Sequence, residues 1–211
     1  MAKSKQSVSS TESTATPSRG RPRSATARQA ILDATLEAVF IVGFRALSMD
    51  AIAAAAGVGK MTIYRRWPNK AALVMDAFLS KVGPTTAFPE TPTALASIHL
   101  QMRLQVKAFR GRYGRLIKSL LGEAQFDAEL ASAFREQWIM PRRVLAREAI
   151  ERAIREKDFR ADVDVDVAID MLYAPIYYRL QIGVAPLSEQ YVDDVFEQVV
   201  QGLQVERRKR V

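Results

Sequence analysis

The stretch at residues 47–73, LSMDAIAAAAGVGKMTIYRRWPNKAAL, constrains the fold more strongly than any other part of the chain. It predicts two short helices that cross at a steep angle. The four alanines at 53–56 supply the small side chains that a close crossing needs, and Gly57 tolerates the positive φ of a tight turn. Val58 follows the turn and is expected to place an apolar side chain between the two helices. The second helix is therefore expected at about 60–66, ended by the Trp-Pro pair after it.

Capping residues and glycines delimit the helices before this pair. The first helix is expected to begin near Ser24 or Thr26, because Thr26 and Gln29 fit a capping box, and to end at Gly43. Ser48 can cap the helix that follows.

Helical spacing of apolar residues continues beyond the proline-rich segment at 84–92, and no window shows the strict alternation of a strand. Pro141 is expected to kink one of the later helices. We therefore predict an all-α fold, with further helices at 93–110, 113–124, 127–157, 164–183 and 188–206.

Positive charge is concentrated in the first part of the chain. Residues 1–82 hold 12 Lys and Arg against 5 Asp and Glu, whereas residues 83–211 hold 19 against 18. This asymmetry predicts an N-terminal module that binds a polyanion and a nearly neutral C-terminal module. Charge alone does not choose between nucleic acid and membrane phospholipid.

Several classes of protein are disfavoured by what the sequence lacks. It contains no cysteine, no apolar run of membrane-spanning length and no signal-peptide pattern at its start, so we expect a soluble cytoplasmic protein with no membrane partner. His99 is the only histidine, which argues against a multi-histidine metal site. No cluster of acids, bases or nucleophiles stands out. We expect neither an enzyme nor a bound cofactor or metal.

The second helix of the pair is expected to turn Ile63 inward, and this leaves its polar and basic side chains partly outward. Such side chains can donate hydrogen bonds to guanine edges or to phosphates, or contact a thymine methyl. A helical hairpin with a merely solvated basic face is the alternative interpretation. The outward set is Lys60, Met61, Thr62, Arg65 and Arg66.

Residues 24–80 resemble the N-terminal region of the TetR family of helix-turn-helix transcriptional regulators. The resemblance is carried by an aromatic-rich phrase at the end of the second helix, in which the matching residues are Thr62, Ile63, Tyr64, Trp67, Pro68 and Lys70. Gly59 departs from the pattern, because the family usually has Ser or Thr there, and Met61 stands where many relatives have a smaller residue.

The resemblance implies that Tyr64 and Lys70 bind phosphate, and that Lys60, Met61, Thr62 and Arg65 lie nearest the bases. The complete set of predicted DNA-binding residues is Arg21, Arg23, Thr26, Ser48, Lys60, Met61, Thr62, Tyr64, Arg65, Arg66 and Lys70.

The Arg-Gly-Arg-Pro-Arg segment at 19–23 resembles the core of an AT-hook, an extended segment that enters a narrow minor groove. The alternative is a disordered basic tail that only raises non-specific affinity. Either way, we expect this arm to contribute to DNA binding.

The C-terminal half contains two strongly apolar helices. Residues 164–183 leave almost no polar face, and the last helix has a broad apolar stripe. Pairing both helices with their copies would form a four-helix dimer interface like that of the family; a monomer core is the alternative. The predicted interface residues are Met171, Pro175, Ile176, Val192, Val195, Phe196, Val199 and Leu203.

Aromatic and methionine side chains in the same half could line an apolar pocket, although each could equally be an ordinary core residue. The candidates are His99, Met102, Phe109, Phe126, Phe134, Trp138, Met171, Tyr173 and Tyr177. They suggest an apolar or aromatic ligand.

Together these features predict a disordered basic arm at 1–23, a three-helix helix-turn-helix DNA-binding domain at 24–82, and a helical ligand-binding and dimerisation domain at 83–211. By resemblance, the expected function is that of a homodimeric repressor that binds a palindromic double-stranded DNA operator and is released by an unknown small molecule. A helical enzyme and an architectural DNA-binding protein are the competing hypotheses.

Overall fold

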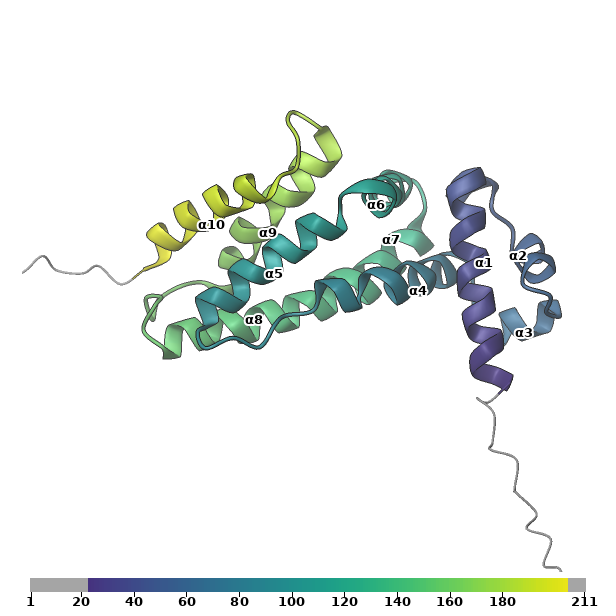
Figure 1. The fold of residues 1–211 in the computed structure, drawn as a ribbon, viewed down its shortest axis with the longest axis horizontal. Helices are drawn as coiled ribbons and strands as arrows, with labels where there is room; N and C mark the ends of the chain where they lie inside the picture. Colours follow the sequence, from purple (N-terminus) through teal and green to yellow (C-terminus); the bar gives the residue numbers. More distant parts are fainter. Residues whose placement is uncertain (1–22, 205–211) are drawn as a thin grey trace, which may run out of the picture.

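The computed structural model describes residues 23–204, and their side chains from residue 25 onward. Within this range the protein is helical and has no strand, apart from an isolated bridge between Phe159 and Gln204. The predicted all-α fold is therefore confirmed. Figure 1 shows an elongated molecule with α1–α3 at one end and α9 and α10 toward the other.

The N-terminal end is formed by α1 (Arg23–Ala46), α2 (Met49–Ala55) and α3 (Lys60–Tyr64), and α4 (Lys70–Val82) leads away from it. Gly43 breaks the helical conformation of α1 with φ near 75°, where the sequence places the end of the helix. The predicted capping box is wrong. Helix α1 already begins at Arg23, which places Thr26 inside it, and Gln29 donates to Asp33.

The C-terminal part begins with a 3₁₀ turn, η1 (Pro84–Thr86), which the sequence did not predict. Helices α5 (Ala94–Ala108), α6 (Gly111–Glu123), α7 (Ala128–Phe134), α8 (Met140–Arg155), α9 (Val165–Ile182) and α10 (Glu189–Leu203) follow. Asp164 caps α9 by accepting from the amides of Asp166 and Val167. No helix in residues 23–204 is both long and apolar enough to cross a membrane.

The helix predicted at 127–157 is instead interrupted by a π-helical segment, η2 (Arg135–Ile139), between α7 and α8. The amide of Met140 bonds to the carbonyl of Arg135, five residues earlier. Pro141 follows directly and has no amide hydrogen to continue the regular ladder. The irregularity therefore lies one turn before the proline and includes Trp138.

Trp138 connects the two parts of the core. It is fully buried, and its ring lies 5.1 Å from that of Phe78 on α4 and 6.0 Å from that of Phe109 after α5. Because α4 also packs against α1, the aromatic cluster joins the N-terminal helices to the C-terminal helices through continuous apolar contact.

A second connection runs between α1 and α6. Arg112 pairs with Glu37 at 2.7 Å and lies 3.9 Å from the centre of the Phe40 ring. Arg45 pairs with Glu123 at 2.6 Å. Both ends of α6 are thus held to the helix that supports α2 and α3.

Candidate nucleic-acid interface and cavity

The turn between α2 and α3 has the geometry that the sequence predicts. Gly57 adopts φ near 64°, and the Val58 amide donates to the Ala53 carbonyl at 3.0 Å. Ala53 and Ile63 are buried where the two helices meet. The small side chain of Ala53 allows the close approach, and Ile63 anchors α3 from within.

The first turns of both helices are also fixed. The Ser48 hydroxyl accepts from the Ala51 amide at 3.1 Å, and so caps α2. Gly59 gives α3 no side-chain cap. Lys60 instead forms an ion pair with Asp50 of α2, and the hydrogen bond to this carboxylate raises the pKa of Lys60.

The outer face of α3, together with Arg65 and Arg66 directly after it, carries the side chains that the sequence assigns to DNA. Lys60, Tyr64, Arg65 and Arg66 are exposed, Met61 is 77% exposed, and Thr62 is half-buried. This face has three basic residues and no acidic one. It can therefore approach a phosphate backbone, but its contact with DNA remains a prediction.

A partly buried polar junction positions α3 against α1 and α4. Trp67 is 5% exposed, and its indole nitrogen donates to Asp76 at 2.9 Å. The same carboxylate accepts two hydrogen bonds from Arg28 of α1, at 2.7 and 2.8 Å. The sequence analysis missed Arg28 and Asp76, because the helical pattern does not reveal which polar residues from separate helices meet.

The remaining predicted DNA contacts lie around this unit. Lys70 donates from Nζ to the Arg45 carbonyl at 3.2 Å and lies 4.5 Å from the centre of the Phe44 ring, while Thr26 is exposed in the first turn of α1. Arg21 and most of the predicted arm lie outside the described residues; Arg23 begins α1, and its side chain is also outside the description.

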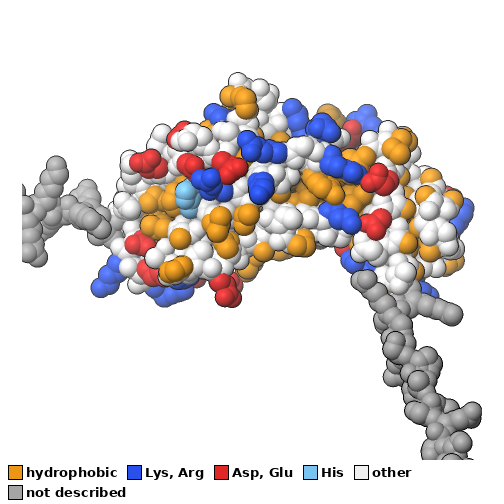
Figure 2. Space-filling view, viewed as in Figure 1, with side chains coloured by type: hydrophobic (Ala, Val, Ile, Leu, Met, Phe, Trp, Pro, Cys, Tyr) orange, Lys and Arg blue, Asp and Glu red, His pale blue; other side chains and the backbone are white. Residues whose placement is uncertain are grey.

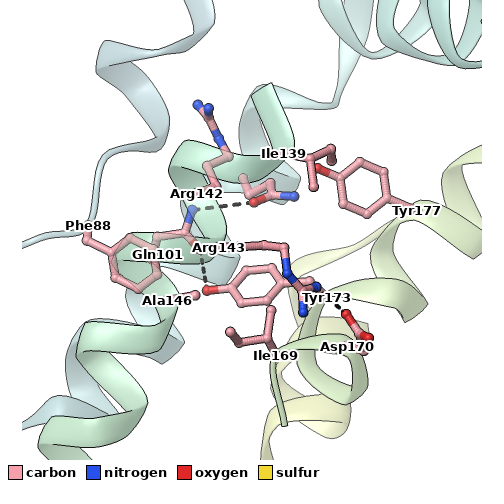
Figure 3. Close-up of a pocket in the computed structure, with 11 residues that line it drawn as sticks. Phe88, Gln101, Ile139, Arg142, Arg143, Ala146, Ile169, Asp170, Tyr173 and Tyr177 are labelled. Atoms are coloured by element: carbon pink, nitrogen blue, oxygen red, sulfur yellow. Dashed lines mark hydrogen bonds and ion pairs between the residues drawn. The ribbon is translucent and has the colours of Figure 1, made fainter. Parts of the chain in front are cut away.

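A cavity of about 160 Å³ lies between α5, α8 and α9. Figure 3 shows Tyr173 and Tyr177 of α9 beside polar and charged side chains from the facing helices. Phe88, Ile139, Ala146 and Ile169 supply the apolar part of the wall. Of the predicted pocket residues, only the two tyrosines line this space.

The other predicted pocket residues lie elsewhere. Most are packed inside the protein, namely Met102, Phe109, Phe134 and Trp138. Phe126 is 84% exposed and Met171 is 43% exposed. His99 lies on the surface of α5, where it contacts Asp193 at 2.6 Å and stacks on Phe196; Figure 2 shows this pale-blue histidine among acidic and basic side chains.

The polar wall of the cavity was not predicted. Tyr173 donates to Gln101 at 2.8 Å, and Gln101 donates to the Thr86 carbonyl at 3.1 Å. Arg143 pairs with Asp170 at the more exposed side. Glutamine and arginine residues in helices give no indication in sequence of the cavity that they face.

Burial shifts the ionisation of three side chains in this wall. It raises the pKa of Tyr173, and it raises the pKa of Tyr177 to about 12 against the lowering effect of the Trp138 hydrogen bond. It lowers the pKa of Arg142 to about 10. At neutral pH the two phenols therefore stay protonated and the Arg142 guanidinium stays cationic. Within residues 23–204, no group of three or more His, Cys, Asp or Glu side chains is placed to hold a metal.

The predicted dimer residues divide into two groups. Ile176 and Val192 are fully buried and Leu203 is 7% exposed in the single chain, where they pack within the core of the domain and offer little surface to a second copy. Met171 is exposed, and the others are half-buried: Pro175, Val195, Phe196 and Val199.

The sequence matches two family models. Residues 31–77 match bacterial regulatory proteins of the tetR family, and residues 88–199 match the tetracyclin repressor-like C-terminal domain. The first match includes α2, α3 and the turn between them, and the second contains the cavity.

Individual transcriptional regulators are also similar to this chain over most of its length. The HTH-type transcriptional regulator YdeS of Bacillus subtilis is 37% identical over 186 residues, which cover 88% of this chain and 94% of that protein. The DNA-binding transcriptional repressor TetR of Mycobacteroides abscessus is 29% identical over 189 residues, covering 86% and 94%. The crystal structure of the TetR family transcription regulator SCO0332 has a TM-score of 0.72 and 34% identity, covering 85% and 99%.

These relatives are transcriptional regulators and not enzymes, and the similarity extends over both the helix-turn-helix and the C-terminal helices. The chain belongs to the TetR family of bacterial helix-turn-helix transcriptional regulators.

Proposed function

We propose that this protein is a ligand-responsive repressor that binds a palindromic operator as a homodimer and releases it when a small molecule occupies the C-terminal cavity. The observation that carries the proposal is the exposed basic face of α3, held by the Gly57 turn and the Trp67–Asp76 bond. A relative named as a DNA-binding transcriptional repressor supports repression as opposed to activation. The division into domains at residue 82, and action in the cytoplasm, are parts of the same proposal.

The surface of α9 supports the dimer. Val167, Met171, Tyr178 and Ile182 are all exposed, and their spacing places them on one face of the helix. A second copy could cover this stripe by isologous packing. Two α3 helices related by a two-fold axis would then contact successive major grooves of a palindrome.

The position of α6 supports coupling between the cavity and DNA. This helix contacts α9, which carries both cavity tyrosines, and its ion pairs hold α1 through Arg112 and Arg45. A ligand that favours one position of α9 would therefore shift α1 and the spacing of the α3 helices. FadR of Bacillus subtilis, which has this fold, has been crystallised with stearoyl-CoA, so the fold can hold a small molecule.

Selection from a random-sequence DNA library with the full chain tests the proposal. We expect enrichment of an inverted repeat whose half-sites lie about one helical turn apart. Enrichment of a single half-site would contradict the dimeric arrangement. Retention of DNA without any enriched sequence would favour an architectural binder instead.

A further inference from the structure

Three hydrogen-bond donors in the cavity wall have no acceptor within the described part of the chain. The Nε2 amide of Gln105 and the Nε atom of Arg142 are buried without a partner. The Tyr177 hydroxyl accepts from the Trp138 indole at 2.7 Å, and no described residue accepts its own proton. Buried polar groups are normally paired, so this cluster indicates that an acceptor is missing.

The three groups lie close enough to influence one another. All three line the same cavity, Gln105 from α5, Arg142 from α8 and Tyr177 from α9. Arg142 and Gln105 also lower the pKa of Tyr177. Gln105 is 1% exposed, so water reaches it poorly. A single ligand group could therefore accept from more than one of these donors.

Arg142 adds an uncompensated positive charge. Its guanidinium donates to Thr86 at 2.7 Å, and weakly to the Trp138 carbonyl at 3.4 Å, and it packs 3.2 Å from the centre of the Trp138 ring. In residues 25–204 it pairs with no carboxylate, whereas the neighbouring Arg143 pairs with Asp166 and Asp170. A partly buried cation without an anion is costly, and an anionic ligand would offset this cost.

The size and the apolar wall restrict the rest of the ligand. A cavity of about 150 Å³ can hold one benzene molecule, and this one measures about 160 Å³. Its apolar wall includes the faces of Phe88 and Ile169. These dimensions suit a single ring with a small polar group, and the free donors require that group to be an acceptor.

We propose that the effector is a small aromatic monocarboxylate whose carboxylate binds Arg142, Gln105 and Tyr177 while its ring occupies the apolar side of the cavity. A carboxylate has only acceptor sites and pairs with a guanidinium by charge-assisted hydrogen bonds, so it complements all three donors. This inference rests on the proposed function, because it names the chemistry of the molecule that would release DNA.

Calorimetric titration of the full chain, without DNA, tests the inference. The probes are benzoate, its neutral analogue benzamide, and acetate, which has the charge without the ring. We expect the wild-type protein to bind benzoate at least about ten-fold more tightly than either analogue. Equal binding of benzoate and benzamide, or no saturable binding of benzoate, would overturn the proposal.

Matched variants locate the carboxylate. Arg142→Met keeps the apolar stem and should weaken benzoate binding by about ten- to hundred-fold, with little effect on benzamide. Arg147→Met is the control, since Arg147 lies on the same helix, pairs with Asp166 at 2.6 Å and does not line the cavity. If Arg142→Met does not fold, Gln105→Met should still weaken the binding of benzoate several-fold. Unchanged binding in the folded variants would reject the site.

A separate DNA titration distinguishes this inference from the proposed function. Benzoate binding without DNA release would support the site but contradict the proposed ligand response. Release of DNA by a neutral aromatic compound, without benzoate binding, would support the proposed ligand response. It would overturn the inference that the effector is a carboxylate.

Discussion

At the scale of single residues, Asp76 is the acceptor shared by Trp67 and Arg28 at the base of the helix-turn-helix unit. Asp76→Ala would leave the buried Trp67 indole and the Arg28 guanidinium without their acceptor. We expect a loss of about 1–3 kcal/mol in the free energy of unfolding, measured by urea denaturation. Asp33→Ala is the control, because the Asp33–Lys81 pair is about half exposed and should cost at most about 1 kcal/mol. Equal losses in the two variants would contradict the role given to Asp76.

Two glycines at the turn should respond in opposite directions. Gly57→Ala forces a side chain into the left-handed region, and we expect it to cost about 1–2 kcal/mol although no atom obstructs the new Cβ. Gly59→Ser adds the side-chain cap that α3 lacks, in extended backbone with open space, and should stabilise by a few tenths of a kcal/mol. Thermal unfolding of both variants checks the sign of each change in stability. Destabilisation by Gly59→Ser would refute this description of the α3 cap.

At the scale of helices, α9 makes the sharpest prediction. Tyr178→Glu places a charge in the exposed stripe that we assign to the dimer interface. In sedimentation-velocity experiments we expect this variant to be a monomer and the wild type to be a dimer. Ile41→Glu is the control, because Ile41 is 80% exposed on α1, away from α9. A Tyr178→Glu protein that remains dimeric would show that another surface forms the interface.

The helices show which features can be predicted from sequence alone. The turn at Gly57 and the Ser48 cap follow from local chemistry. The π segment before Pro141 depends on how the chain accommodates a missing amide hydrogen, which apolar spacing does not report. The dimer interface stays a prediction, and apolar content alone does not show which side chains of α9 reach the surface. Ile176 is as apolar as Ile182, and only packing in three dimensions buries the first and leaves the second 60% exposed.

At the scale of the whole molecule, the two sites differ in how far they could be predicted. The outer face of α3 comes from one contiguous segment, so its residues could be named from a short phrase. The cavity takes Gln105 from α5, Arg142 from α8 and Tyr177 from α9, and it exists only after these helices pack. Aromatic content therefore identified the two tyrosines but not the polar wall.

The salt dependence of operator binding tests the central claim most directly. Fluorescence anisotropy would follow the full chain binding to the selected operator and to a scrambled duplex across a salt series. We predict that only operator binding survives excess competitor, and that a dimer neutralising about 6–10 phosphates gives a log–log slope of roughly −5 to −9. Equal affinity for the scrambled duplex, or no binding to either DNA, would contradict the account.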